Sequence, residues 1–248
     1  MSDKEMSKRQ QRKEQIRRKE RRSRLLSIGL VSAGVLFLAF LFIYPSIKPI
    51  DAVIPAEEYT YPDADFNKVG DPTAPIKIDE YADFQCPFCR IFFEQTERLL
   101  MDNYIANGTV YFEYHTFGEF IGPESVNAAQ AAYCAGDQGK FWPMHATIFT
   151  NQTGENVGAF SDRRLEAFAE QIDGLDLTEW ASCYDSGKYS DLIEQDGKDA
   201  LAAGAQATPT FIFSYEVNGE TKTKSIQGAQ SFDVFQQEIE AALSEMGQ

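Results

Sequence analysis

The 248 residues are 43% apolar, which is enough for one folded domain with a sizeable core and accessory segments. The formal net charge of −15 is unevenly spread, because residues 1–24 carry 11 Lys/Arg against 4 Asp/Glu and the rest of the chain carries 12 against 34. An acidic body argues against nucleic acid as the partner and suggests solubility outside the cytoplasm.

An uncharged apolar run of 20 residues, 25–44, follows the basic tail. At about 1.5 Å of rise per helical residue it spans about 30 Å, the thickness of a bilayer core. We expect a transmembrane anchor with the basic tail, residues 1–24, in the cytoplasm, so that the remainder lies on the extracytoplasmic side of the cell membrane. A cleaved signal peptide is the alternative, but the run is long for one and no Ala-x-Ala site closes it.

The stretch after the anchor is rich in proline, since six of the ten prolines fall between Pro45 and Pro75. With acidic and small polar residues between them, this composition is typical of a semi-rigid extended tether. We therefore expect a linker over residues 45–70 and a folded domain over residues 71–248.

The alternating apolar run from Ile76 to Tyr81 predicts the first strand of that domain. Cys86 and Cys89 follow it, just before a helix predicted from about Cys89 to Ala106. A C-x-x-C at a strand-to-helix junction is the redox signature of the thioredoxin fold. Unpaired N–H groups and the helix dipole at that point favour the thiolate, which is the attacking species in disulfide exchange.

Other uses of the cysteine pair fit the sequence less well. Half of a zinc site would need a second such pair or a C-x-x-H, and none follows. The two histidines, His115 and His145, are far off in sequence and are expected to be structural. A permanent disulfide across two residues would be unusual, so we expect a redox pair with no metal and no cofactor.

The rest of the chain predicts sheet, then a helical block, then sheet again. Residues 110–115 are rich in aromatics and predict a second strand. Strands return at about 210–215 and 221–226, joined by the hairpin signal Asn218-Gly219, before a closing amphipathic helix. The helical block covers about residues 122–204, with helices that begin near Pro123, Lys140, Ser161, Asp176 and Tyr189. This order predicts an α/β thioredoxin fold with an all-helical insertion, preceded by one transmembrane helix.

At this level the chain resembles a known family, the membrane-anchored DsbA-like thiol-disulfide oxidoreductases of bacteria and archaea. The resemblance runs from about Asp71 to the C-terminus and is specific as a combination, whereas C-x-x-C alone is not. It rests on the stretches Asp83-Phe84-Gln85-Cys86-Pro87-Phe88-Cys89, Cys134 to Trp142 with His145, Cys183 to Tyr189, and Ala207-Thr208-Pro209-Thr210.

The resemblance implies a catalytic role for three residues. Cys86 corresponds to the exposed nucleophile and Cys89 to the shielded resolving thiol. Glu80 matches a carboxylate beneath the active site that can relay a proton to or from the inner thiol. An ordinary strand glutamate that faces water is the alternative for Glu80.

The resemblance also implies a substrate-binding set, Thr208, Pro209, Pro87 and Phe88. Pro209 matches the family's cis-proline, and the backbone of Thr208 can pair with an extended substrate strand. Phe88 departs from the best-known member, which has His there, because phenylalanine cannot donate a hydrogen bond to the thiolate. The strength of the oxidant is therefore left open.

The two remaining cysteines, Cys134 and Cys183, fall in the helical insertion, on the apolar sides of their helices. Two buried neighbouring thiols would not stay reduced in an oxidising compartment, so we predict a structural disulfide. Its Cα atoms must lie within about 7 Å of each other. Two unconnected buried cysteines, or a second redox pair, are the alternatives.

The function expected from this resemblance is donation of the Cys86–Cys89 disulfide to exported proteins as they fold. The implied partners are unfolded or reduced exported proteins and a quinone-linked membrane oxidoreductase of the DsbB or vitamin K epoxide reductase (VKOR) type. A disulfide isomerase or reductase of the same fold is the first alternative. A non-enzymatic metal-binding domain or holdase is the second, although copper sites usually recruit Met or His and the closest Met is Met101.

Overall fold

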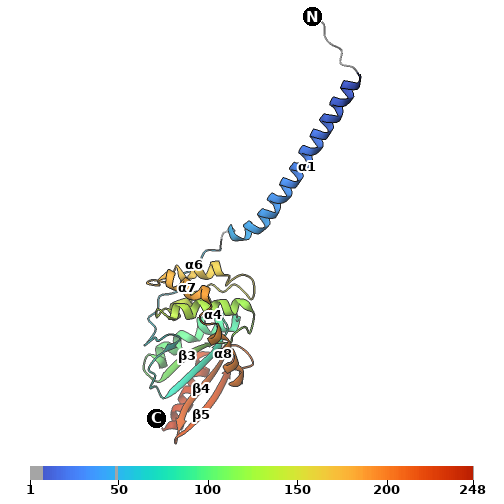
Figure 1. Ribbon diagram of the computed structural model, residues 1–248. Coiled ribbons are helices and arrows are strands. Elements are labelled where there is room, and N and C mark those ends of the chain that lie inside the picture. Colours follow the sequence, from blue (N-terminus) through green and yellow to red (C-terminus); the bar gives the residue numbers. More distant parts are fainter. Residues whose placement is uncertain (1–7, 48–49, 248) are drawn as a thin grey trace. The chain divides into compact units, whose positions relative to one another are not determined.

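The computed structural model describes residues 8–47 and 50–247, which divide into two compact units between Asp51 and Ala52. The first unit contains α1 (Lys8–Ile47), one continuous helix (Figure 1). Within it, Gln11–Tyr44 is long and apolar enough to cross a membrane. Its apolar side chains are exposed rather than packed in a core, which is the pattern of a membrane span or a signal sequence.

The second unit is built on a five-stranded sheet with the strand order β1-β3-β2-β4-β5 (Figure 1). The strands are β1 (Lys68–Val69), β2 (Ile76–Ala82), β3 (Val110–Thr116), β4 (Thr210–Val217) and β5 (Glu220–Gln227). Strands β2 and β3 are parallel, and the other neighbours are antiparallel. The sequence did not predict β1, because two residues are too short to show an alternation.

The β4–β5 hairpin turns through Asn218 and Gly219, as the Asn-Gly pair predicts. Their φ angles are 53° and 80°, in the left-handed region that a two-residue hairpin turn requires.

The helix after β2 begins at Pro87, two residues earlier than the sequence predicted, and Cys86 is its N-cap residue. Proline suits this first position because its missing N–H would have had no helical partner. The helix consists of α2 (Pro87–Phe92), the π-helical turn η1 (Phe93–Glu97), α3 (Arg98–Leu100) and a second π-helical turn, η2 (Met101–Ile105).

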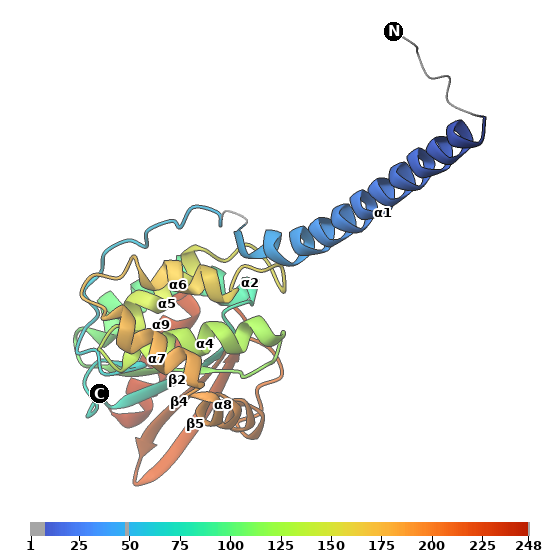
Figure 2. The ribbon, with the colours of Figure 1, turned by 45° about the horizontal axis from the view of Figure 1, so that its top comes forward.

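The insertion between β3 and β4 is helical within the described residues. Its helices are α4 (Pro123–Gly136), α5 (Phe141–Thr150), α6 (Asp162–Ala169), α7 (Leu177–Ser186) and α8 (Ser190–Ala202). Figure 2 shows α4 to α7 grouped together beside the strands. A disulfide between Cys134 and Cys183 joins α4 to α7, with their Cα atoms 5.7 Å apart.

The two faces of the sheet are covered by different helices. On one face Phe211 of β4 contacts Phe92 of α2 and Phe235 of α9 (Phe232–Met246), with ring centroids 4.5 and 4.8 Å away. On the other face His115 of β3 contacts Asp196 of α8. Because side chains alternate along a strand, neighbouring residues of β2 point into these two different environments.

The folded unit begins at Ala52, so the expected linker over residues 45–70 is wrong from Ala52 onward. The Ile54 N–H donates to Asn151 Oδ1 at 2.8 Å, and the ring of Tyr61 stacks on Trp142 at 5.3 Å. The proline content suggested a tether, but aromatic side chains in this segment gain more by burial against the domain than by exposure to water.

Candidate redox site

Cys86 and Cys89 are free thiols at the start of α2. Both are buried, with 5% of Cys86 and 1% of Cys89 exposed. The expectation that Cys86 is exposed is therefore wrong, because the loop before β4 covers it: Cys86 Sγ lies 3.4 Å from the carbonyl oxygen of Thr208. Pro87 and Phe88 of the motif are exposed, Phe88 to 58%.

The thiol of Cys86 is acidified by its surroundings. A hydrogen bond from the Cys89 thiol to Cys86 lowers the pKa of Cys86 most. Burial raises that pKa, but hydrogen bonds from the Thr208 hydroxyl and from the N–H groups of Cys89 and Phe88 lower it further. The net result is a pKa of about 6 for Cys86. The Thr208 Oγ1 has no hydrogen-bond partner among the described residues, so its hydroxyl can donate to the thiolate. At neutral pH Cys86 is thus mostly thiolate without any histidine in the motif.

The thiol of Cys89 has the opposite character. Burial raises its pKa well above the usual range, and the neighbouring Cys86 and Glu80 raise it further. Glu80 is only 1% exposed, which rules out the alternative that it faces water. Burial, then the charges of Glu97 and Cys86, raise the pKa of Glu80, so its carboxyl group can hold a proton at neutral pH.

The loop opposite the cysteines carries the predicted proline. The Thr208–Pro209 peptide bond is cis. Pro209 has no N–H, and its carbonyl oxygen accepts from Gly228 N–H at 2.7 Å. Pro87, Phe88, Thr208 and Pro209 therefore lie around Cys86, on the helix start and the loop that flank it.

Two residues that the sequence did not single out hold the cysteine loop in place. Asp83 Oδ1 accepts from Gln85 N–H at 2.8 Å, and its Oδ2 accepts from Ile121 N–H at 3.1 Å. Gln152 Nε2 donates to the carbonyl oxygens of Phe84 at 2.6 Å and Cys86 at 3.1 Å. Asp83 stands in the quoted motif and could have been noticed, whereas nothing local marks Gln152, which lies two residues after the end of α5.

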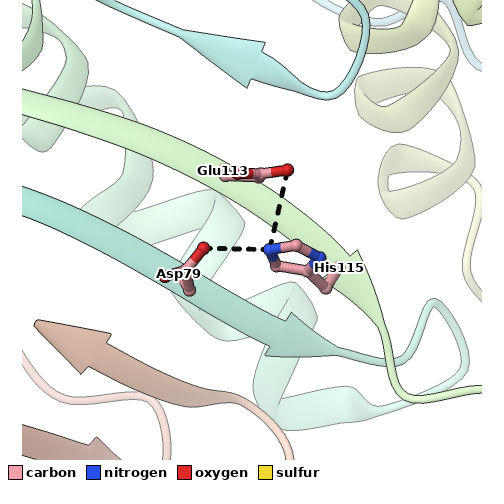
Figure 3. A group of neighbouring side chains, drawn as sticks. All are labelled: Asp79, Glu113 and His115. Carbon is pink, nitrogen blue, oxygen red and sulfur yellow. Dashed lines mark hydrogen bonds and ion pairs between the residues drawn. The ribbon is translucent and has the colours of Figure 1, made fainter. Parts of the chain in front are cut away.

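A separate group of charged side chains lies on the other face of the sheet. Figure 3 shows Asp79, Glu113 and His115 converging, with His115 Nε2 at 2.9 Å from Asp79 and 3.8 Å from Glu113. One ligand atom from each lies within 4.8 Å of the others, as in a metal site. However, Lys77 Nζ lies 2.8 Å from both carboxylates, so an ammonium group already supplies the positive charge that a metal would bring.

This cluster should make stability depend on pH. Burial alone would lower the pKa of His115, but hydrogen bonds to Asp196 and Asp79 outweigh it and raise the pKa from 6.5 to about 9. Because the pKa of His115 is higher in the folded than in the unfolded chain, protonation of His115 stabilises the fold. This contribution to the free energy of unfolding is complete below pH 6.5 and is lost as the pH rises through about 9. We expect the wild type to lose about 2–3 kcal/mol more than His115→Gln over that interval. Urea unfolding of both chains in detergent at several pH values measures it; a pH-independent difference between them would contradict the prediction.

The model of the family described as Thioredoxin matches residues 66–241. The chain belongs to the thioredoxin family. The match includes Cys86, Cys89, the cis-proline and the whole helical insertion of this thioredoxin-family chain.

Among curated relatives, the Na⁺/H⁺ antiporter NhaA 1 of Salinispora arenicola is 32% identical over 170 residues, which cover 68% of this chain and 23% of that protein. The Na⁺/H⁺ antiporter NhaA of Herminiimonas arsenicoxydans is 30% identical over 142 residues, 57% of this chain and 21% of that protein. The thioredoxin-family chain therefore spans less than a quarter of the length of these relatives.

Solved structures place the fold among DsbA proteins. BdbD from Bacillus subtilis has a TM-score of 0.63 at 21% identity, over 77% of this chain and 100% of that one. The α-DsbA1 of Wolbachia pipientis has a TM-score of 0.60 at 21% identity, over 73% and 92% of the two chains. DsbA2 of Pseudomonas aeruginosa has a TM-score of 0.56 at 23% identity, over 71% and 93%. The thioredoxin fold with its helical insertion is thus DsbA-like.

Proposed function

We propose that this protein is an extracytoplasmic thiol-disulfide oxidoreductase that donates the Cys86–Cys89 disulfide to exported proteins as they fold. The observation that carries the proposal is the asymmetry of the two thiols: surrounding hydrogen bonds lower the pKa of Cys86 to about 6, and burial raises the pKa of Cys89. A stabilised Cys86 thiolate favours the reduced form, and a pair that favours its reduced form gives its disulfide away.

The reaction proceeds through one mixed disulfide. A substrate thiolate attacks Cys86 Sγ, the Cys86–Cys89 bond breaks, and the sulfur of Cys89 leaves with the electron pair. Because Cys89 holds its proton tightly, the leaving thiolate takes one from Glu80. A second substrate thiolate then attacks the substrate sulfur of the mixed disulfide and releases Cys86 as a thiolate, so the substrate is oxidised and the protein reduced by two electrons.

Substrate binding is assigned to the groups around Cys86. The loop at Thr208 and Pro209 offers backbone to an extended chain, and Pro87 and Phe88 give the site an uncharged, apolar rim. An apolar rim of this kind suits unfolded polypeptide rather than a small polar thiol.

The membrane arrangement belongs to the same proposal. Residues 25–44 anchor the protein with the basic tail in the cytoplasm, following the positive-inside rule. A membrane oxidoreductase that passes electrons to quinone, of the DsbB or VKOR type, restores the Cys86–Cys89 disulfide. Holding both proteins in one membrane raises their effective concentration.

The proposal is tested by trapping of the mixed disulfide. In the full-length protein, Cys89→Ala should accumulate exported proteins bonded to Cys86, because the thiol that releases them is missing. Cys86→Ala should trap none, since Cys89 is buried beneath the helix start. Non-reducing gels of cells that express each variant measure this, and trapping by Cys86→Ala instead would overturn the assignment.

The reduction potential of the pair separates donation from isomerase or reductase activity. We expect a value between those of thioredoxin and DsbA, about −270 and −120 mV. Equilibration of the full-length protein with glutathione measures it, and a value at or below the lower limit would favour a reductase.

A further inference from the structure

A second buried carboxyl group lies in the same core as Glu80. Glu97 stands at the end of the π-helical turn η1, and only 4% of it is exposed. Its Oε2 has no hydrogen-bond partner among the described residues. A buried carboxyl without a partner is costly, so its presence calls for a physical explanation.

The side chain beside Glu97 is an equally unsatisfied histidine. His145 of α5 is fully buried, and its Nε2 lies 3.6 Å from Glu97 Oε2. Neither of its ring nitrogens has a hydrogen-bond partner among the described residues. Burial raises the pKa of Glu97 to about 8 and lowers that of His145 to about 3, so this pair is a neutral carboxyl beside a neutral imidazole at pH 7.

Between His145 and the redox site lies Tyr114. It pairs in register with Glu80 on the parallel strands β2 and β3, so the two side chains share one face of the sheet. The ring centroids of Tyr114 and His145 are 5.1 Å apart, and the Tyr114 hydroxyl also lacks a partner among the described residues. Four side chains with unsatisfied polar atoms, those of Glu80, Tyr114, His145 and Glu97, therefore lie in this part of the core.

This group of side chains opens to solvent at Glu97. Glu97 lines a cavity of about 400 Å³ with Tyr59, Tyr61 and Phe93. Exposed Glu57 also lines the cavity, so water reaches it. The segment over residues 52–61, which the sequence suggested to be a linker, thus forms one wall of the opening.

We propose that His145 and Glu97 connect the buried carboxyl of Glu80 to solvent in this cavity. The inference rests on the proposed function, in which Glu80 exchanges a proton with Cys89. Burial holds the pKa of Glu80 well above its usual range, and in the reduced protein the charge of Cys86 raises it further, so the carboxyl of Glu80 carries a proton. That proton must leave before Glu80 can act as a base.

The path matters in the oxidation half-reaction. The Cys86 thiolate first attacks one sulfur of the oxidising partner's disulfide, the partner's S–S bond breaks, and its other sulfur leaves as a thiolate. The sulfur of Cys89 then attacks Cys86 Sγ, the Cys86–partner bond breaks, and the partner leaves as a thiolate with the electron pair. The proton of Cys89 passes to Glu80, which has first released its own proton through His145 and Glu97 to water. In the reduction half-reaction Glu80 already holds the proton that Cys89 takes, so no exchange with solvent is needed.

The two half-reactions give a test that a structural role cannot imitate. In full-length Glu97→Gln, oxidation of the reduced pair by glutathione disulfide at pH 7 should slow about 10-fold or more, while reduction of the disulfide by dithiothreitol stays within about twofold. Stopped-flow fluorescence follows both reactions. Glu57→Gln is the matched control, since it removes an exposed carboxylate from the same cavity, and it should change neither rate.

Glu97 is a neutral carboxyl at pH 7, so Glu97→Gln removes the group that passes the proton and changes the charge near Glu80 little. An oxidation rate in Glu97→Gln equal to or above that of the wild type therefore overturns the path. The wild type offers a second measurement in case the variant does not fold: the solvent deuterium isotope effect should be larger on oxidation than on reduction. Equal isotope effects would also overturn the path, whereas a wild type that exchanges no disulfides would overturn the proposed function instead.

Discussion

Glu80→Gln is expected to slow disulfide exchange at Cys89 about 100-fold at pH 7 in both directions, because a general acid–base group of this kind contributes at least that factor. Glutamine fills the same space beneath the cysteines but can neither give a proton to the leaving Cys89 thiolate nor take one from the attacking thiol. Reduction by dithiothreitol and oxidation by glutathione disulfide measure the two directions. The loss in both directions distinguishes Glu80 from Glu97, whose replacement should slow oxidation alone.

The matched control for this variant is Glu113→Gln. Glu113 stands next to Tyr114 on β3, so its side chain lies on the opposite face of the sheet, where it contacts Lys77 at 2.8 Å. This substitution should leave both rates unchanged. If Glu80→Gln exchanges disulfides as fast as Glu113→Gln, then Cys89 exchanges its proton without Glu80 and the proposed role is wrong.

Removing the Cys134–Cys183 disulfide is expected to lower the free energy of unfolding by about 4 kcal/mol. The bond closes a loop between residues 49 apart in sequence, and opening it restores conformational freedom to the unfolded chain. Urea unfolding of the full-length Cys134→Ala/Cys183→Ala protein in detergent measures the change. The redox site should keep its chemistry, because the bond joins α4 to α7, whereas Cys86 and Cys89 lie at the start of α2.

The control for this prediction is the double variant Cys86→Ala/Cys89→Ala. It also removes two sulfur atoms, but from two free thiols instead of a disulfide. Under conditions that keep Cys86 and Cys89 as thiols, its effect should be smaller than that of losing the insertion disulfide. Equal unfolding midpoints for the Cys134/Cys183 double variant and the wild type would show that the bond contributes nothing to stability.

Several features of this protein follow from local sequence alone. The C-x-x-C after an alternating run marks the strand-to-helix junction, because the spacing of apolar residues and the position of Pro87 act over a few residues. Asn218-Gly219 marks its hairpin for the same reason. The burial of Glu80 could also have been predicted from the sequence. Glu80 follows Ile76 and Ile78 at every second position, so its side chain lies on the same apolar face of the strand.

Other features depended on segments far apart in the chain. The burial of Cys86 is decided by the loop at Thr208, and the packing of residues 52–61 by an aromatic surface on the insertion. His145 looked like an ordinary residue of an aromatic helix. Only the folded chain brings it to 3.6 Å from Glu97, because α5 and η1 come from different parts of the sequence. Local patterns determine which residues form strands, helices and turns, whereas the pKa values and proton contacts of a buried site depend on which distant groups replace the water around each polar atom.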